Sequence, residues 1–130
     1  MTPLQKLITE ERKARILGFD WPNYEMIFEQ MIDEIREVRE DIDNNAPPHK
    51  LQEEIGDVLH VAISLCVYAG FDVEETFGLV NNKFSKRMSR VEELTKQRGL
   101  PNLKGQSMEF MLELWREAKK MENKNENNKL

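Results

Sequence analysis

The side chains best able to do chemistry in this chain are four carboxylates, arranged as two pairs at helical spacing. Glu34 and Glu37 lie three positions apart in the segment DEIRE, and Glu54 and Asp57 repeat that spacing in EEIGD. Side chains at positions i and i+3 project from the same face of a helix. Carboxylate oxygens are the ligands that hard divalent cations such as Mg²⁺ or Mn²⁺ prefer. The four residues are therefore candidate metal ligands.

The segment between the two acidic pairs is expected to bring them close together in space. Pro47 and Pro48 cannot continue a helix, so the helices on either side are expected to be antiparallel neighbours. On the helix predicted before Pro47, apolar residues form a stripe along one face. Glu34 falls about 20° beyond the edge of this stripe and Glu37 about 80° beyond it. Both carboxylates can then turn toward the neighbouring helix.

Two other readings of the acidic residues stay open at this point. Four carboxylates without a cation repel one another, on the order of a few kcal/mol per pair at ~4 Å, but Arg36, Arg39 and water could instead solvate an ordinary acidic face. A di-iron carboxylate bundle would need two Glu-x-x-His pairs, and only Asp57-x-x-His60 resembles one.

The second half of the chain carries the opposite charge. Lys83 and Arg87 lie at i and i+4, a cationic face able to hold phosphate oxygens. Trp115 and Lys119 repeat this spacing and combine an aromatic plane with an ammonium group. Metal-binding carboxylates, cations and an aromatic plane are together what a magnesium–nucleotide complex needs.

The elements that position these residues are predicted to be helices. Five helices are predicted, over about residues 2–17, 23–44, 50–69, 72–98 and 107–120, with a possible bend near Asn81 and Asn82. The third is apolar on nearly all sides after Asp57 and is predicted to be the central core element. Phe84 is also predicted in the core. Trp21, in an aromatic connector, could be an anchor or a ligand contact.

Length and composition exclude several classes of protein. The 130 residues carry 19 Lys and Arg against 24 Asp and Glu, a net charge of −5, with one cysteine. These numbers argue against a disulfide framework, a cysteine-rich zinc site and a general nucleic-acid binder. No apolar run reaches the ~20 residues that span a bilayer, and the N-terminus lacks a signal-peptide pattern. One cytoplasmic domain over residues 1–120, with a disordered polar tail over 121–130, is expected.

Five segments in order make the chain resemble the MazG-type nucleoside triphosphate pyrophosphohydrolases, of the all-α NTP pyrophosphatase superfamily. The segments are ARILGFDWP, DEIRE, EEIGD, NNKFSKRMSRVE and LELWREAKK. The chain departs from the family at Gln30, where lysine is usual, and at Asp33, which replaces the first glutamate of the acidic motif. It also departs at His60, Ser64 and Val67, where phenylalanine, asparagine and arginine are often found. These departures leave the choice of substrate open.

The resemblance implies a four-helix-bundle-like fold with an extra N-terminal helix, in a homo-oligomer, dimer or tetramer. It implies hydrolysis of (deoxy)nucleoside triphosphates to monophosphate and pyrophosphate with Mg²⁺, for which Mn²⁺ could substitute. No membrane or nucleic-acid partner is expected. The metal ligands that the resemblance implies are Glu34, Glu37, Glu54 and Asp57, and these four with Lys83 and Arg87 are the implied catalytic residues. The implied substrate-binding residues are Lys83, Arg87 and Lys119 for the phosphates and Asn81, Trp115 and Trp21 for the nucleotide.

Two alternative functions remain. One is a dUTP- or alarmone-directed hydrolase of the same superfamily, which only a substrate panel distinguishes. The other is a non-enzymatic helical module whose acidic and basic faces bind another protein, which would release no phosphate.

Overall fold

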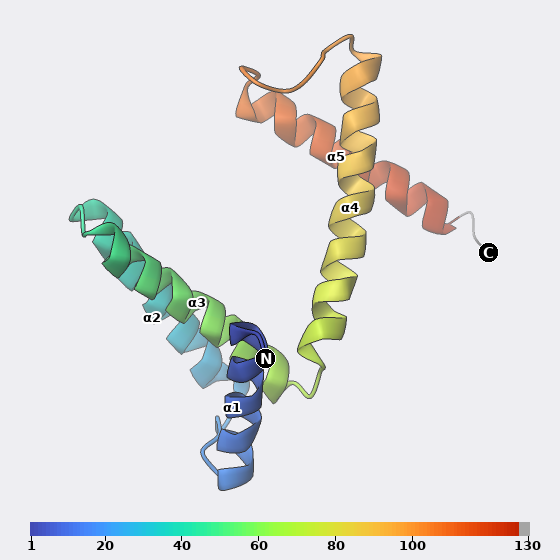
Figure 1. Cartoon of the computed structure of the whole chain (residues 1–130). Helices are drawn as coiled ribbons and strands as arrows, with labels where there is room; N and C mark the ends of the chain where they lie inside the picture. The colour runs from blue at the N-terminus through green and yellow to red at the C-terminus, as the bar shows by residue number, and fades with distance from the viewer. Residues whose placement is uncertain (128–130) are drawn as a thin grey trace. The chain divides into compact units, whose positions relative to one another are not determined.

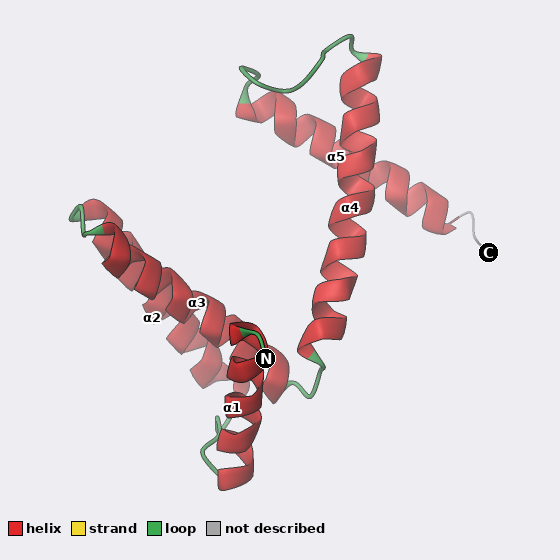
Figure 2. Cartoon of the chain, viewed as in Figure 1, coloured by secondary structure: helices red, strands yellow, loops and turns green. Residues whose placement is uncertain are grey.

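The computed structural model describes residues 1–127, and the side chains of residues 1–122. It contains five α-helices and, within those residues, no strand (Figures 1 and 2). The all-α prediction is confirmed. The helices are α1 (Pro3–Leu17), α2 (Tyr24–Asp43), α3 (Pro48–Tyr68), α4 (Val73–Gln97) and α5 (Met108–Asn127).

Local capping explains where the helices begin and end. Asn23 accepts a hydrogen bond from Met26 N at 3.0 Å, and Asp72 accepts one from Glu75 N at 3.0 Å. Ser107 accepts one from Phe110 N at 3.1 Å. Such N-cap side chains satisfy backbone donors that have no partner within the helix. Gly18 ends α1 with φ of 98°, a left-handed conformation that glycine adopts readily.

Two helix boundaries and one expected bend differ from the sequence prediction. Helix α3 begins at Pro48, inside the segment expected to be only a breaker, because proline in the first turn needs no hydrogen bond from its nitrogen. Helix α4 continues through Asn81 and Asn82 as one element. Helix α5 continues to Asn127, past its predicted end near Lys120. The rest of the predicted disordered tail, residues 128–130, lies outside the described residues.

The contacts divide the chain into two compact units, Met1–Thr76 and Phe77–Leu130. In the first unit, α2 and α3 lie side by side as an antiparallel hairpin and α1 packs on α3 (Figure 1). Its core contains Ile8, Ile63 and Val73, and the α2 residue Ile27 is fully buried.

Helix α3 was predicted to be a core element, apolar and covered on nearly all sides. The exposure of its residues shows that this prediction is wrong. Leu59 is 63% exposed, whereas Val61, Ile63 and Ser64 are buried. Only one stripe of α3 is covered by α1 and α2, and the buried stripe includes a hydroxyl group.

In the second unit, α4 and α5 cross and pack through Val91, Leu114 and Ala118 (Figure 1). Trp115 is half-buried and packs against this cluster. Phe84, predicted in the core, is 57% exposed, because α5 covers the second half of α4 and Phe84 belongs to the first half.

No single described helix is long and apolar enough to cross a membrane, although α3 and α4 together, as a bent pair, would meet that length and composition.

Candidate functional site

The predicted meeting of the two acidic pairs is present in the α2–α3 hairpin. Glu34 and Glu37 project from α2, and Glu54 and Asp57 from α3. One oxygen from each carboxylate lies within 4.8 Å of the others. We call these four residues the carboxylate cluster. The antiparallel arrangement of two adjacent helices, each with an i, i+3 pair, produces this convergence.

Two oxygens of the cluster are buried without compensation. Glu34 Oε2 and Glu54 Oε2 have no hydrogen-bond partner among the described residues. The other oxygen of Glu34, Oε1, accepts a hydrogen bond from Gln30 Nε2 at 2.7 Å, which orients the carboxylate. Burying an unpaired anionic oxygen is unfavourable unless a cation or a donor compensates it. The cluster therefore fits a hard divalent cation, whose ligands are oxygens.

The close negative charges of the carboxylate cluster raise the proton affinity of one of its residues, Glu37. The pKa of Glu37 is raised from 4.5 to about 7, first because its protonated form donates a hydrogen bond to Glu54. The negative charges of Glu34 and Glu54 raise it further. A proton thus takes part of the compensating role that a metal ion would have in this site.

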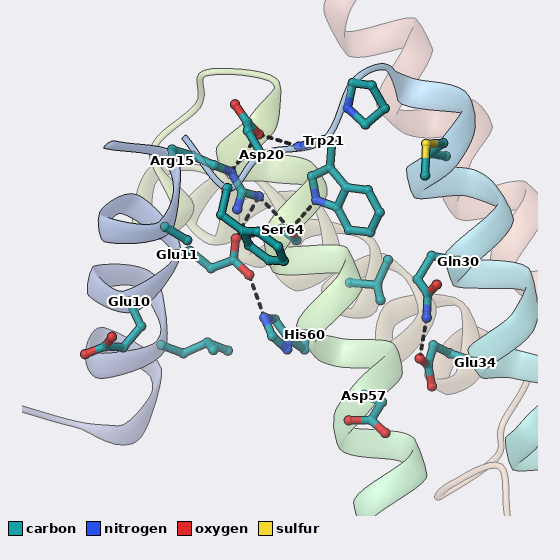
Figure 3. A pocket seen from close by; sticks show the side chains of 16 residues that line it. Glu10, Glu11, Arg15, Asp20, Trp21, Gln30, Glu34, Asp57, His60 and Ser64 are labelled. Atoms are coloured by element: carbon teal, nitrogen blue, oxygen red, sulfur yellow. Dashed lines mark hydrogen bonds and ion pairs between the residues drawn. The ribbon is translucent and has the colours of Figure 1, made fainter. Parts of the chain in front are cut away.

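A pocket of about 570 Å³ adjoins the carboxylate cluster, because Glu34 and Asp57 also line it (Figure 3). Its walls come from three helices, α1, α2 and α3, and from the connector between α1 and α2. Leu7, Phe19, Trp21, Pro22 and Met26 supply apolar or aromatic surface. A cavity of this size with a few polar groups is typical of small-molecule sites.

The pocket also contains a connected polar network (Figure 3). Glu11 of α1 is only 8% exposed and lies 2.5 Å from His60 Nε2 and 2.7 Å from Arg15 Nη2. Ser64 donates to Glu11 at 3.1 Å and accepts from Trp21 Nε1 at 2.8 Å. Trp21 is therefore anchored by Ser64 and lines the pocket, and its contact with a ligand stays a prediction.

The predicted phosphate-binding residues belong to the second unit. Arg87 Nε lies 2.9 Å from Glu122 Oε2, and its guanidinium carbon lies 5.4 Å from the centre of the Trp115 ring. Phe84 contacts the same ring, with centroids 6.0 Å apart. Arg87 lowers the pKa of Glu122 through their hydrogen bond.

Three further predicted substrate residues, Asn81, Lys83 and Lys119, are exposed. The second unit thus brings Arg87 and Trp115 together, and the first unit brings the carboxylates together. That both sets act on one substrate stays a prediction.

Sequence reasoning missed Glu11 and Arg15 as pocket residues. Their i, i+4 spacing on α1 looks like an ordinary surface ion pair. His60 and Ser64 were noticed as departures from a family pattern, and His60 also in the spacing Asp57-x-x-His60, but neither was assigned to a pocket. Nothing local reveals that Glu11 contacts His60, because the two residues are 49 positions apart.

Fold and site together define a class: an all-α protein with a carboxylate cluster that fits a divalent cation, beside a pocket large enough for a small molecule. The family model for the MazG nucleotide pyrophosphohydrolase domain matches residues 23–92, more than half of the chain. The chain belongs to this family, which is one of divalent-metal-dependent hydrolases. The match includes the four carboxylates, Lys83 and Arg87, and ends before Trp115.

Two relatives whose names match this family are similar over most of this chain. The nucleoside triphosphate pyrophosphohydrolase of Escherichia coli K12 is 30% identical over 116 residues, covering 86% of this chain and 43% of that protein. The nucleoside triphosphate pyrophosphohydrolase/pyrophosphatase MazG of Thermotoga maritima is 32% identical over 109 residues, with 84% and 41% covered. This chain thus spans less than half the length of either relative.

Proposed function

We propose that this chain hydrolyses nucleoside triphosphates to monophosphate and pyrophosphate with a divalent cation, Mg²⁺ or Mn²⁺. The observation that carries the proposal is the carboxylate cluster, with two uncompensated buried oxygens, at the edge of a nucleoside-sized pocket. Membership of the MazG family and the names of the relatives support the same reaction.

The chain's own residues divide the work as follows. Glu34, Glu37, Glu54 and Asp57 hold the metal, which when bound neutralises phosphate charge and lowers the pKa of water. The adjoining pocket binds the nucleoside. Lys83, Arg87 and Lys119 hold the phosphates, so Arg87 exchanges its contact with Glu122 for the substrate. Asn81 and Trp115 complete the substrate site.

The residues implicated come from both compact units, so we further propose that residues 1–120 act as one catalytic domain. Positioning and charge neutralisation account for most of the catalysis of phosphoryl transfer. A domain that supplies carboxylates from one part and cations from another meets both requirements.

The test is pyrophosphate release from a panel of canonical and modified (deoxy)nucleoside triphosphates, with and without Mg²⁺. We expect metal-dependent release for the native protein. Glu54→Gln should lower kcat by roughly a hundredfold or more, because it removes a metal ligand without changing side-chain size. Glu53→Gln is the matched control, since Glu53 is the exposed neighbour outside the cluster.

The outcomes separate the alternatives. Release confined to dUTP or to an alarmone would replace the broad substrate class with a narrow one. No release and no metal-dependent shift in melting temperature would support a non-enzymatic binding module and contradict the proposal.

We also propose that the chain forms a homo-oligomer. Phe77, Val80 and Phe84 form an apolar strip along the first half of α4 and are 43%, 52% and 57% exposed. On α2, Phe28, Ile32, Ile35 and Ile42 are also exposed. Exposed apolar strips of this length are uncommon in monomeric proteins. A second copy of this chain would bury them.

A further inference from the structure

The residues that line the pocket fall into two groups with different chemistry (Figure 3). Glu34 and Asp57 belong to the carboxylate cluster, where the metal and phosphates are proposed to bind. Glu11, Arg15, Trp21, His60 and Ser64 form the polar network on the other side. The second group has no place in the metal chemistry, so it needs another role.

The Ser64 hydroxyl is the centre of this network and uses its full hydrogen-bonding capacity. It accepts from Arg15 Nη2 at 2.8 Å and from Trp21 Nε1 at 2.8 Å, and it donates to Glu11 Oε2 at 3.1 Å. A hydroxyl has one donor and two acceptor sites. The network therefore fixes the indole ring of Trp21 in the pocket wall.

The Glu11 carboxylate is buried and receives three donors, from His60, Arg15 and Ser64. Replacing such a buried ionic network with apolar side chains is often neutral or stabilising. Stability alone therefore does not explain it. The network also lines a cavity of about 570 Å³, where its remaining polar atoms can meet a ligand.

The atoms left over define what that ligand must offer. A carboxylate only accepts, so His60 donates to Glu11 through Nε2, and Nδ1 of the ring is left for a second hydrogen bond. Arg15 spends its Nη2 on Glu11 and Ser64, and no hydrogen bond within the described residues involves its Nη1. The pocket wall thus presents a guanidinium donor and a second imidazole nitrogen, both able to hydrogen-bond to a ligand. Every nucleobase carries adjacent donors and acceptors on its edge.

We propose that Arg15 and His60 recognise the hydrogen-bonding edge of the nucleobase, and that Glu11 is a specificity-determining positioning residue that holds them. This inference rests on the proposed function, because it assigns the base-reading part of the same site. Glu11, Arg15 and Trp21 lie outside residues 23–92, the region that the family model matches. His60 and Ser64 lie inside that region, so the proposed base-reading group combines residues from within the matched domain with residues that precede it.

The experiment measures binding without catalysis. Affinities of the four canonical nucleoside monophosphates are determined by calorimetry in EDTA for the native protein, Glu11→Gln and His60→Ala. We expect the native protein to discriminate among the bases. Both variants should reduce the ratio between the tightest and weakest affinities by about tenfold, since a site built for polar groups discriminates through them.

Controls distinguish recognition from structural damage. Glu25→Gln removes the same charge from an exposed position of α2 outside the pocket and should leave the ratio unchanged. His60 is 48% exposed, so His60→Ala keeps the test valid if Glu11→Gln unfolds. In a Trp115→Phe background, Ser64→Ala should lower the fluorescence anisotropy of Trp21, since the indole loses its hydrogen bond.

The inference is overturned if the native protein binds no monophosphate or all four equally. It is also overturned if both variants weaken all four by one common factor, which is what a purely structural role predicts. Failure of the proposed hydrolysis would appear differently, as selective binding of monophosphates with no metal-dependent pyrophosphate release from any triphosphate.

Discussion

At the scale of single residues, the raised pKa of Glu37 has a consequence for metal binding. Its pKa is raised to about 7 by the hydrogen bond to Glu54 and by the charges of Glu34 and Glu54. A proton and a divalent cation compensate the same negative charge, so they should compete. The carboxylate cluster is thus expected to gain metal affinity as the pH rises toward neutrality.

This competition predicts a pH-dependent stability in the metal-free protein. The unfolded chain releases the Glu37 proton near pH 4.5, whereas the folded chain holds it until about pH 7. The folded state binds more protons between these values, so the free energy of unfolding falls as the pH rises through this window. Melting temperatures in EDTA from pH 5 to 8 should show the fall.

The matched variant for this prediction is Glu37→Gln, which has no titrating carboxyl at this position and should show a shallower fall. Adding Mg²⁺ above pH 7 should raise the melting temperature of the native protein more than that of the variant. Identical pH slopes for the two proteins would contradict the assignment of this pKa to Glu37.

A second residue-scale prediction concerns Lys83. Removing its ammonium group in Lys83→Ala should weaken binding of a non-hydrolysable triphosphate by about tenfold, because charge-assisted hydrogen bonds to phosphate are lost. Metal affinity should stay nearly the same, because the carboxylates are untouched. Calorimetry measures the first quantity and Mn²⁺ titration the second.

Lys86→Ala is the control, since Lys86 is an exposed lysine of the same helix. Equal losses for the two variants would indicate only a general charge effect. A loss of metal affinity in Lys83→Ala would show that the phosphate-binding end had been misplaced.

At the scale of elements, helix ends and the carboxylate cluster could be predicted because their causes are local. Helices were predicted to end near residue 17 and to begin near residues 72 and 107, and Gly18, Asp72 and Ser107 cap them there. The i, i+3 acidic pairs needed only the turn at Pro47 to become neighbours. Short-range sequence patterns were therefore enough to predict most of the helices and the carboxylate cluster of the candidate site.

The polar network could not be predicted, because it depends on contacts between distant segments. Ser64 lies 43 positions from Trp21 and 53 from Glu11. A serine on an apolar helix does not indicate these partners. The exposure of Phe84 was missed for a related reason: its stripe continues into a buried one, and only the position of α5 shows where the covering ends.

The capping of α4 gives a prediction at this scale. Asp72→Ala should lower the free energy of unfolding by about 1 kcal/mol, because Glu75 N loses its acceptor at the helix start. Asp72→Asn keeps an acceptor oxygen and should cost much less. Urea denaturation measures both. Equal losses would point instead to the ion pair of Asp72 with Arg12, at 3.5 Å.

At the scale of the whole molecule, the amount of buried apolar surface is small for a chain of this length. Eight hydrophobic residues are buried among those described, while many large apolar side chains of α2, α3 and α4 are exposed. Two compact units with small cores need further burial to be stable. Association of copies would supply it and would make folding depend on protein concentration.

The apolar strip of α4 permits a direct test of this association. We expect sedimentation to give a multiple of 15.4 kDa for the native protein. Val80→Asp should shift the distribution toward the monomer and lower the melting temperature, because a charge buried in an interface is unfavourable. Asn82→Asp adds the same charge two positions away, off the strip, and should do neither. A native protein that sediments as a monomer at all concentrations, or a Val80→Asp variant that stays associated, would remove α4 from the interface.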